Sequence, residues 1–167
     1  MNQQILNQIQ TSDNFFSKRD HNSILSYCKK CSYTWGEVDT ANTPPTGMIH
    51  NIPEDEKVYS TIKNRIEESI PDMTKMKLYR MYINCFAPNE RPYYHTDQED
   101  GDGLTFLYYP QKDWSLDEGG ETQFYVDSNL YGIYPEPNRM VMFDAKMLHR
   151  ATSFRNKHRF TIAVKYN

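Results

Sequence analysis

Two histidines and one aspartate carry the strongest chemical signal in this sequence. His95 and Asp97 are two positions apart, so in an extended segment both side chains would point to the same side. His149 follows much later, in a run typical of a strand. Two imidazoles and one carboxylate on one face would bind an ion such as Fe(II) and leave its opposite side open. The sequence therefore predicts a metal site at His95, Asp97 and His149.

A second signal lies just downstream of the last histidine. Arg159 begins a run of aromatic and β-branched residues, 159–165, that is typical of a strand. Alternation would place Arg159 and Thr161 on one face of that strand. A guanidinium offers a rigid fork of hydrogen-bond donors, and a buried one requires an anion. We therefore expect this face to bind a carboxylate.

Further motifs stand in order between these residues. They are Gly101-Asp102-Gly103, Leu107-Tyr108-Tyr109, Lys112-Asp113-Trp114, Gly119-Gly120-Glu121-Thr122 with Phe124, Pro135 to Asn138 and Met140 to Phe143. With His95-Thr96-Asp97, His149 and Arg159, the segment resembles the catalytic core of the 2-oxoglutarate- and Fe(II)-dependent oxygenases. It is most similar to the prolyl-4-hydroxylase branch, which includes the oxygen-sensing prolyl hydroxylases. The C-terminal half carries this resemblance closely and the N-terminal half only in outline.

The resemblance implies cofactors and roles for these residues. Fe(II) would bind the two histidines and the aspartate, and 2-oxoglutarate would chelate the metal with its far carboxylate on Arg159. O2 would be the oxidant and L-ascorbate a further cofactor. The reaction would convert 2-oxoglutarate to succinate and CO2 while hydroxylating a C–H bond. Further cofactor-binding candidates are Tyr109, which could equally be a core aromatic residue, and Thr161, Tyr82 and Asn84.

Several functions remain open at this stage. Hydroxylation of a prolyl residue in a protein or peptide comes first, and a free amino acid such as proline is another candidate substrate. The stretch from Asn84 to Pro88 also resembles the nucleobase demethylases of the AlkB type, which carry a second arginine where this chain has Lys165. A metal-binding jelly roll without turnover would need the same ligands. Zinc would also accept them, but zinc hydrolysis has no need of Arg159.

Two departures from the oxygen-sensing hydroxylases concern the substrate side of the site. This chain has Phe86 where those enzymes carry a tyrosine beside the cosubstrate, and Lys165 where they carry a tryptophan. Gly119 and Gly120 would let a strand approach the metal without a Cβ atom in the way, although a plain turn would explain the pair as well.

The elements that would position these residues follow from the hydrophobic pattern. Ser17 would cap a helix over residues 18–30, and a second helix over 54–70 would end at Pro71. Short strands are expected at 33–35, 76–86, 93–97, 104–109, 122–126, 139–143, 149–154 and 159–166. Such a series predicts an all-β core with supporting N-terminal helices, as a jelly-roll double-stranded β-helix.

Length and the order of these elements predict the domain organisation. Residues 1–167 would form one domain, with 1–74 as mainly helical support and 75–167 as the catalytic β core. The polar segment from Val38 to Ile52 holds two prolines and a glycine, and we expect it to close over the substrate as a lid.

Composition narrows the classes of partner. A net charge of -3 makes nucleic acid an unlikely ligand. No apolar run is long enough to span a membrane and residues 1–4 do not resemble the start of a signal peptide, so we expect a cytoplasmic protein. Cys28 and Cys31 have no second cysteine pair, which favours reduced structural thiols over a zinc site.

Overall fold

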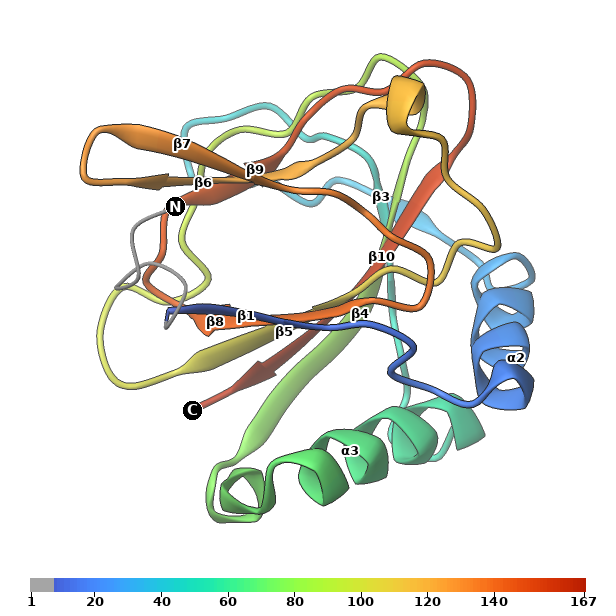
Figure 1. Cartoon of the computed structure of the whole chain (residues 1–167). Helices are drawn as coiled ribbons and strands as arrows, with labels where there is room; N and C mark the ends of the chain where they lie inside the picture. The colour runs from blue at the N-terminus through green and yellow to red at the C-terminus, as the bar shows by residue number, and fades with distance from the viewer. Residues whose placement is uncertain (1–7) are drawn as a thin grey trace.

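Two antiparallel sheets face each other in this computed structural model, which describes residues 8–167 (Figure 1). The larger sheet has seven strands in the order β1-β8-β5-β10-β4-β3-β2, and the smaller has three in the order β7-β6-β9. The strands are β1 Ile9–Ser12, β2 Thr34–Trp35, β3 Met48–Asn51, β4 Leu78–Phe86, β5 Leu104–Tyr108, β6 Thr122–Val126, β7 Asn129–Ile133, β8 Met140–Asp144, β9 His149–Ala151 and β10 Arg159–Tyr166.

Two α-helices cover the face of the larger sheet that points away from the smaller one (Figure 1). They are α2 Lys18–Cys28 and α3 Lys57–Ser69, and the 3-10 helices are η1 Pro71–Lys75 and η2 Leu116–Glu118. Both predicted helices are therefore confirmed, with slightly shorter bounds. The Ser17 hydroxyl accepts a hydrogen bond from the backbone N–H of Asp20 at 3.2 Å, as expected of a helix cap.

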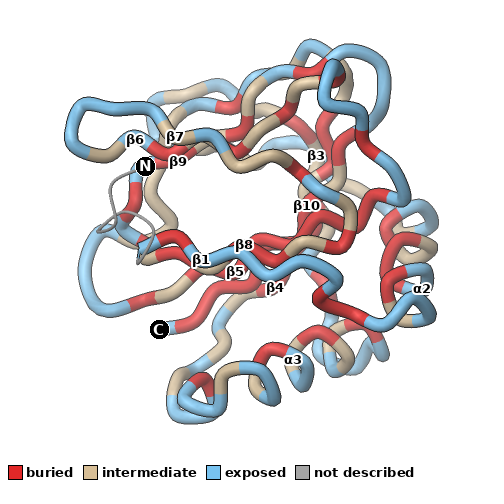
Figure 2. The backbone as a smooth tube through the Cα atoms, in the orientation of Figure 1, coloured by how far each residue is buried: buried red, intermediate tan, exposed pale blue. Residues whose placement is uncertain are grey.

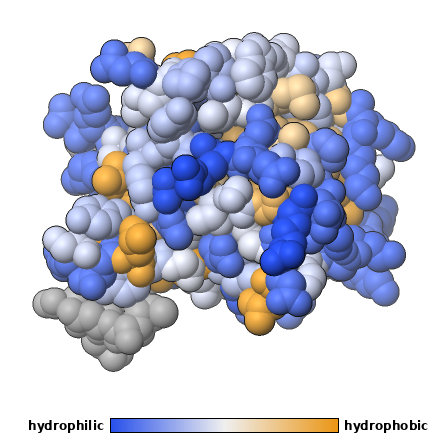
Figure 3. All heavy atoms as spheres, turned by 90° about the horizontal axis from the view of Figure 1, so that it is seen from above, coloured by the Kyte–Doolittle hydropathy of each residue, from blue (hydrophilic) through white to orange (hydrophobic). Residues whose placement is uncertain are grey.

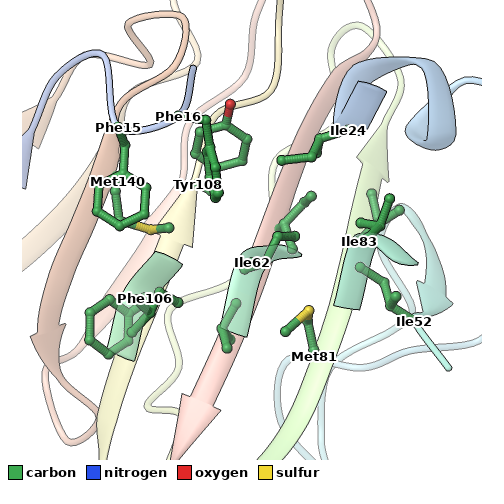
Figure 4. Packing of buried hydrophobic residues seen from close by; sticks show 14 of the residues in the cluster. Phe15, Phe16, Ile24, Ile52, Ile62, Met81, Ile83, Phe106, Tyr108 and Met140 are labelled. Carbon is green, nitrogen blue, oxygen red and sulfur yellow. The ribbon is translucent and has the colours of Figure 1, made fainter. Parts of the chain in front are cut away.

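The core has two main layers, one on each side of the larger sheet. Helix α3 contributes Ile62 to the outer layer, where it meets Met81 and Ile83 of β4 (Figure 4). Figure 2 shows the same division, with the buried side of each helix turned to the sheet and the opposite side exposed. The inner layer lies between the sheets and includes Leu107, Phe124 and other residues. Successive side chains of β4, β5 and β10 point to opposite faces of the larger sheet. The outer face is therefore apolar, and the inner face carries both apolar and polar side chains.

The structure corrects several sequence-based expectations. Residues 93–97 do not form a strand, because His95 makes only an isolated bridge to His149. Residues Met48–Asn51 were expected to belong to a mobile lid, but they form β3 and pair with β4. Strands β1 and β7 were not predicted. Strand β10 has the predicted bounds, and it lies between β4 and β5.

The remaining expectations concern the surface and the termini. Within residues 8–167, no helix is long and apolar enough to cross a bilayer. Residues 1–4, which were assessed as a possible signal start, lie outside the described residues. The face in Figure 3 is mainly hydrophilic, and its hydrophobic areas are small and separate. Cys28 and Cys31 are both free thiols, and burial raises the pKa of each.

Candidate metal and carboxylate site

Three potential metal ligands meet on the inner side of the larger sheet. One ligand atom from each of His95, Asp97 and His149 lies within 4.8 Å of the others. The histidine backbones form a reciprocal bridge, with both N–H to O distances at 3.0 Å, and this sets the two rings side by side. The backbone N–H of Asp97 donates to Ala145 at 2.8 Å. The chain therefore brings together the ligands that the sequence predicted, although their first segment is not a strand.

Both histidines are oriented for coordination through Nε2. Nδ1 of His95 lies 3.1 Å from the carbonyl oxygen of Tyr93, and Nδ1 of His149 lies 2.9 Å from that of Met147. A proton on Nδ1 satisfies those carbonyls and leaves the Nε2 lone pair free for a metal. Burial lowers the pKa of His149 to about 4, so its imidazole is neutral at physiological pH. This is the protonation state that coordination requires.

The carboxylate of Asp97 is also held in its ionised form. Burial opposes its ionisation, but His149 and Lys165 lower its pKa to about 2. The Thr105 hydroxyl donates to Oδ2 at 2.6 Å, and Nζ of Lys165 lies 2.7 Å from Oδ1. Burial likewise opposes the charge on Lys165, but Tyr82 and Asp97 raise the pKa of that ammonium. The site therefore presents a fixed carboxylate anion beside the neutral imidazole of His149.

Arg159 lines the same cavity as the three potential metal ligands. No carboxylate within residues 8–167 pairs with it. Its side chain is 1% exposed, Nε donates to the Gly120 carbonyl at 2.9 Å, and Nη2 donates to the Thr122 hydroxyl at 3.0 Å. Among the salt bridges within residues 8–167, none includes Arg159. A buried guanidinium that bonds only neutral oxygens is ready to receive an anion from outside the chain.

A cavity of about 230 Å³ joins the two ends of the site. Thr161 from β10 and both Tyr82 and Asn84 from β4 line this cavity, as their strand alternation predicts. Tyr109 does not line it. Its hydroxyl instead donates to Thr122 at 2.7 Å, behind the Arg159 guanidinium. Tyr109 therefore lies outside the cavity, but it supports Arg159 in two ways: its ring centroid is 5.5 Å from the guanidinium carbon, and its hydroxyl bonds Thr122.

Three further residues lie at the site but were not predicted from the sequence to belong to it. Thr122 bonds both Tyr109 and Arg159, Lys165 bonds Asp97, and Asp39 lies near His95. In the sequence, Thr122 belongs to the motif that begins at Gly119, and Lys165 replaces the tryptophan of the oxygen-sensing hydroxylases. No signal in the sequence marks Asp39, because it is one acid within a polar segment.

The glycine pair has a role different from the expected one. A Cβ atom on Gly120 would lie 3.1 Å from Trp114 and 3.4 Å from Arg159, and φ is +81° at this residue. Gly119 approaches Ser153 in the same way. Gly120 therefore leaves room for the Trp114 and Arg159 side chains, and Gly119 leaves room for the Ser153 carbonyl. The nearest atoms to each glycine belong to none of the predicted metal ligands, so the expected close approach to those ligands was wrong.

The fold and the site define a class of protein in which facing β-sheets place three potential metal ligands beside a buried arginine. The family model described as the 2OG-Fe(II) oxygenase superfamily matches residues 80–166, which include every one of the predicted ligands and Arg159. The chain belongs to this superfamily, whose members are enzymes that use Fe(II), 2-oxoglutarate and O2. The all-β core with two helices is consistent with the double-stranded β-helix fold of these oxygenases.

Solved structures with the same fold include enzymes of several kinds. A prolyl-4-hydroxylase from Pseudomonas putida aligns with a TM-score of 0.78 at 10% identity, covering 96% of this chain and 92% of that one. A Trichoplax adhaerens prolyl hydroxylase, in complex with a hypoxia-inducible-factor peptide, gives 0.76 at 19% identity over 99% and 86%. HygX from Streptomyces hygroscopicus, with nickel and 2-oxoglutarate bound, gives 0.77 at 12% identity over 98% and 85%. A search of curated proteins found no match.

Proposed function

We propose that this chain hydroxylates a prolyl residue in a protein or peptide, with 2-oxoglutarate converted to succinate and CO2. In this proposal Fe(II) binds His95, Asp97 and His149, and Arg159 holds the far carboxylate of 2-oxoglutarate. One observation carries the assignment: a compact set of potential metal ligands shares a cavity with a buried arginine that pairs with no acid within residues 8–167. Residues that meet both requirements fit the cofactor and the cosubstrate together.

The residues of the chain divide the work between binding and orientation. When bound, Fe(II) and 2-oxoglutarate supply the oxidising chemistry with O2, which the protein itself does not provide. Arg159 fixes the cosubstrate at one end, and Thr122 orients the guanidinium with support from Tyr109. Thr161 adds a hydroxyl on the same strand face. Tyr82 and Asn84 line the same cavity and are further candidates for contact with the cosubstrate.

The choice of a prolyl substrate comes from the related structures. Two of the proteins with this fold are prolyl hydroxylases, and one was solved with a peptide from hypoxia-inducible factor. HygX was solved with hygromycin B, so a small molecule is the second candidate class of substrate. Nucleobase demethylation and hydroxylation of a free amino acid are further alternatives. We also propose a jelly-roll winding of one catalytic domain, a cytoplasmic location, and L-ascorbate as the reductant that keeps iron ferrous.

Mass spectrometry with a matched variant tests the proposal. Purified protein is incubated with Fe(II), ascorbate, O2, 2-oxoglutarate and a library of proline-containing peptides. We expect succinate together with a peptide that gains one oxygen atom on proline, and neither product from His149→Ala. Succinate formed only with a small-molecule library would shift the substrate class. No succinate under any condition would contradict the assignment of the oxygenase site.

A further inference from the structure

Asp39 links the segment before β3 to a predicted metal ligand. One carboxylate oxygen, Oδ2, accepts the backbone N–H of Tyr93 at 2.7 Å and the hydroxyl of Thr46 at 3.0 Å. The other, Oδ1, lies 3.4 Å from Nδ1 of His95. The Asp39 side chain is 14% exposed, so water has little access to it. The carboxylate is therefore fixed at one end and directed at the histidine with the other.

The position of Oδ1 matches a known way of orienting a metal-bound imidazole. A ligating histidine commonly donates its second ring N–H to a carboxylate or a carbonyl, which fixes the ring and makes the coordinating nitrogen more basic. His95 has both acceptors close to Nδ1, the Tyr93 carbonyl at 3.1 Å and Asp39 at 3.4 Å. Within residues 8–167, the Met147 carbonyl is the hydrogen-bond partner of Nδ1 of His149, and no carboxylate pairs with that atom. A carboxylate beside Nδ1 therefore distinguishes His95 from His149, which is also the more buried of the two.

We propose that Asp39 is a positioning residue that orients His95 and ties the 37–46 segment to the metal centre. The proposal rests on the metal site assigned above. Asp39 comes from the segment that covers the cavity, since Glu37, Val38 and Thr46 also line it. Linkage then works in both directions: metal binding stabilises the docked segment, and the docked segment tightens metal binding.

A neighbouring carboxylate provides the matched control. Glu37 lies two residues from Asp39 in the same segment and pairs with Nη1 of Arg80 at 2.8 Å. No hydrogen bond or ion pair joins Glu37 to either histidine among the contacts of the described chain. Glu37→Gln therefore removes a charge from the same segment and leaves in place the Asp39 contacts to Tyr93, Thr46 and His95 that tie the segment to the metal ligands. Asp39→Asn keeps one oxygen for Tyr93 and Thr46, but places an NH2 group against His95.

Co(II) binding and the proton spectrum of the Co(II) protein test the proposal. Asp39→Asn should weaken Co(II) binding about 10- to 100-fold, whereas Glu37→Gln should stay within about twofold of wild type. The paramagnetically shifted N–H signal of His95 should move in Asp39→Asn, while that of His149 serves as the internal reference. A purely structural role for Asp39 would leave the His95 signal in place.

The outcomes separate this proposal from the one on which it rests. Wild-type affinity in Asp39→Asn, or equal weakening by Glu37→Gln, overturns the role of Asp39. If wild type and His149→Ala bind Co(II) equally, or neither binds it, the metal site itself is misassigned and both proposals fail.

Discussion

The buried charge of Arg159 destabilises the ligand-free protein. A bound carboxylate would offset this destabilisation. A buried guanidinium loses its hydration, and hydrogen bonds to Gly120 and Thr122 recover only part of that loss. Burial accordingly lowers the pKa of Arg159. Arg159 thus lowers the unfolding free energy of the ligand-free protein. Such a cost is common where binding requires a charge that is already in place.

Replacing Arg159 by methionine should separate binding from stability. The variant removes the buried charge and keeps a long apolar side chain, so the unfolding free energy of the ligand-free protein should stay within about 1 kcal/mol of wild type or rise. The affinity for 2-oxoglutarate should fall by about 2–4 kcal/mol, roughly 30- to 1,000-fold. Urea unfolding and titration of 2-oxoglutarate measure the two effects. Arg159→Lys should recover binding only in part, because an ammonium lacks the fork of donors.

An unchanged affinity in Arg159→Met would place the cosubstrate elsewhere in the cavity. A large loss of stability without loss of binding would contradict the energetic reasoning as well.

Removing His149 should abolish metal retention. His149→Ala deletes one of the three ligands, and the protein should lose Fe(II) on gel filtration and form no succinate. The ring packs against both Phe124 and Phe143, so the variant should also unfold more easily, by about 2–4 kcal/mol. His158→Ala is the control, since that histidine is exposed. Retention of iron by His149→Ala would contradict the assigned ligand set.

At the residue scale, the sequence was informative where residue type and spacing both constrain the chemistry. His95 and Asp97 lie together because of a two-residue spacing, and Arg159 stands out because a cation in an apolar strand needs a reason. Tyr109 was ambiguous, because a buried hydroxyl needs a partner whether it binds a ligand or not. Asp39 could not be predicted, since its contact with His95 depends on how a polar segment folds over the cavity.

At the scale of elements, the segment before β3 is anchored mainly by its acids. Glu37 pairs with Arg80, and Asp39 bonds Tyr93 and Thr46. Val38 is 43% exposed, so little apolar burial holds this part down. Only the part preceding Met48–Asn51 is free to act as the predicted lid, because those four residues belong to β3.

Limited proteolysis should detect closure of that segment. Cleavage within residues 38–46 should slow when Fe(II), the inactive analogue N-oxalylglycine and a hydroxylatable peptide are present together, because closure excludes the protease as well as water. Peptide bonds within residues 127–130, the exposed turn between β6 and β7, provide the reference for protease activity. Equal cleavage with and without a proven substrate would show that the segment does not close over it.

Helix α2 contributes a pH-dependent contact with the sheet. His21 is buried, with Nδ1 2.5 Å from the hydroxyl of Tyr108, which itself donates to Asn138. Burial lowers the pKa of His21 below 6.5, against a hydrogen bond with the Gln111 backbone that raises it. Below pH 6.5 the unfolded chain takes up a proton that the folded chain excludes, so stability should be lost as the pH falls.

His21→Gln tests this contribution, because glutamine keeps an N–H donor for Tyr108 but does not titrate. Urea unfolding at pH 7.5 and pH 5.5 should show a smaller loss of stability in the variant than in wild type. The difference between the two proteins isolates His21, since His149 shifts in the same direction and is present in both. Equal losses would contradict a neutral, buried His21.

Element prediction succeeded where periodicity was long and failed where partners were distant. Val58, Ile62 and Ile66 recur at helical spacing, and α3 forms as expected. Strand β1 is short and mostly polar. It forms because it pairs with β8, which lies far from it in the sequence. Strands β3 and β7 are likewise short, with four and five residues, and β7 contains a glycine, which is unfavourable in a strand. Pairing partners rather than local sequence decide such strands.

At the scale of the whole molecule, the outer layer supports the site from behind. Ile62 of α3 is 0% exposed and packs on the strand that carries Tyr82 and Asn84 on its other face. Ile62→Ala should lower the unfolding free energy by about 2–4 kcal/mol through lost burial and a cavity. Asn64→Ala, on the exposed side of the helix, should change it by less than about 0.5 kcal/mol.

Thermal and urea unfolding measure both variants, and metal affinity is determined on the folded protein. Because Ile62 touches no candidate ligand, that affinity should be the same as in wild type. Similar stabilities of the two variants would mean that α3 is not essential to the core.

The central place of β10 has a consequence for how the protein is made. Strands β4 and β5 are separated in sequence but become neighbours of one strand, which leaves the ribosome after both of them. Until β10 emerges, each keeps an unpaired edge, and such edges are prone to association with other chains. The same strand delivers Arg159, Thr161 and Lys165 to the cavity. A nascent chain that stalls before β10 therefore lacks its central strand and its carboxylate-binding residue together, and cannot persist as a folded but inactive enzyme.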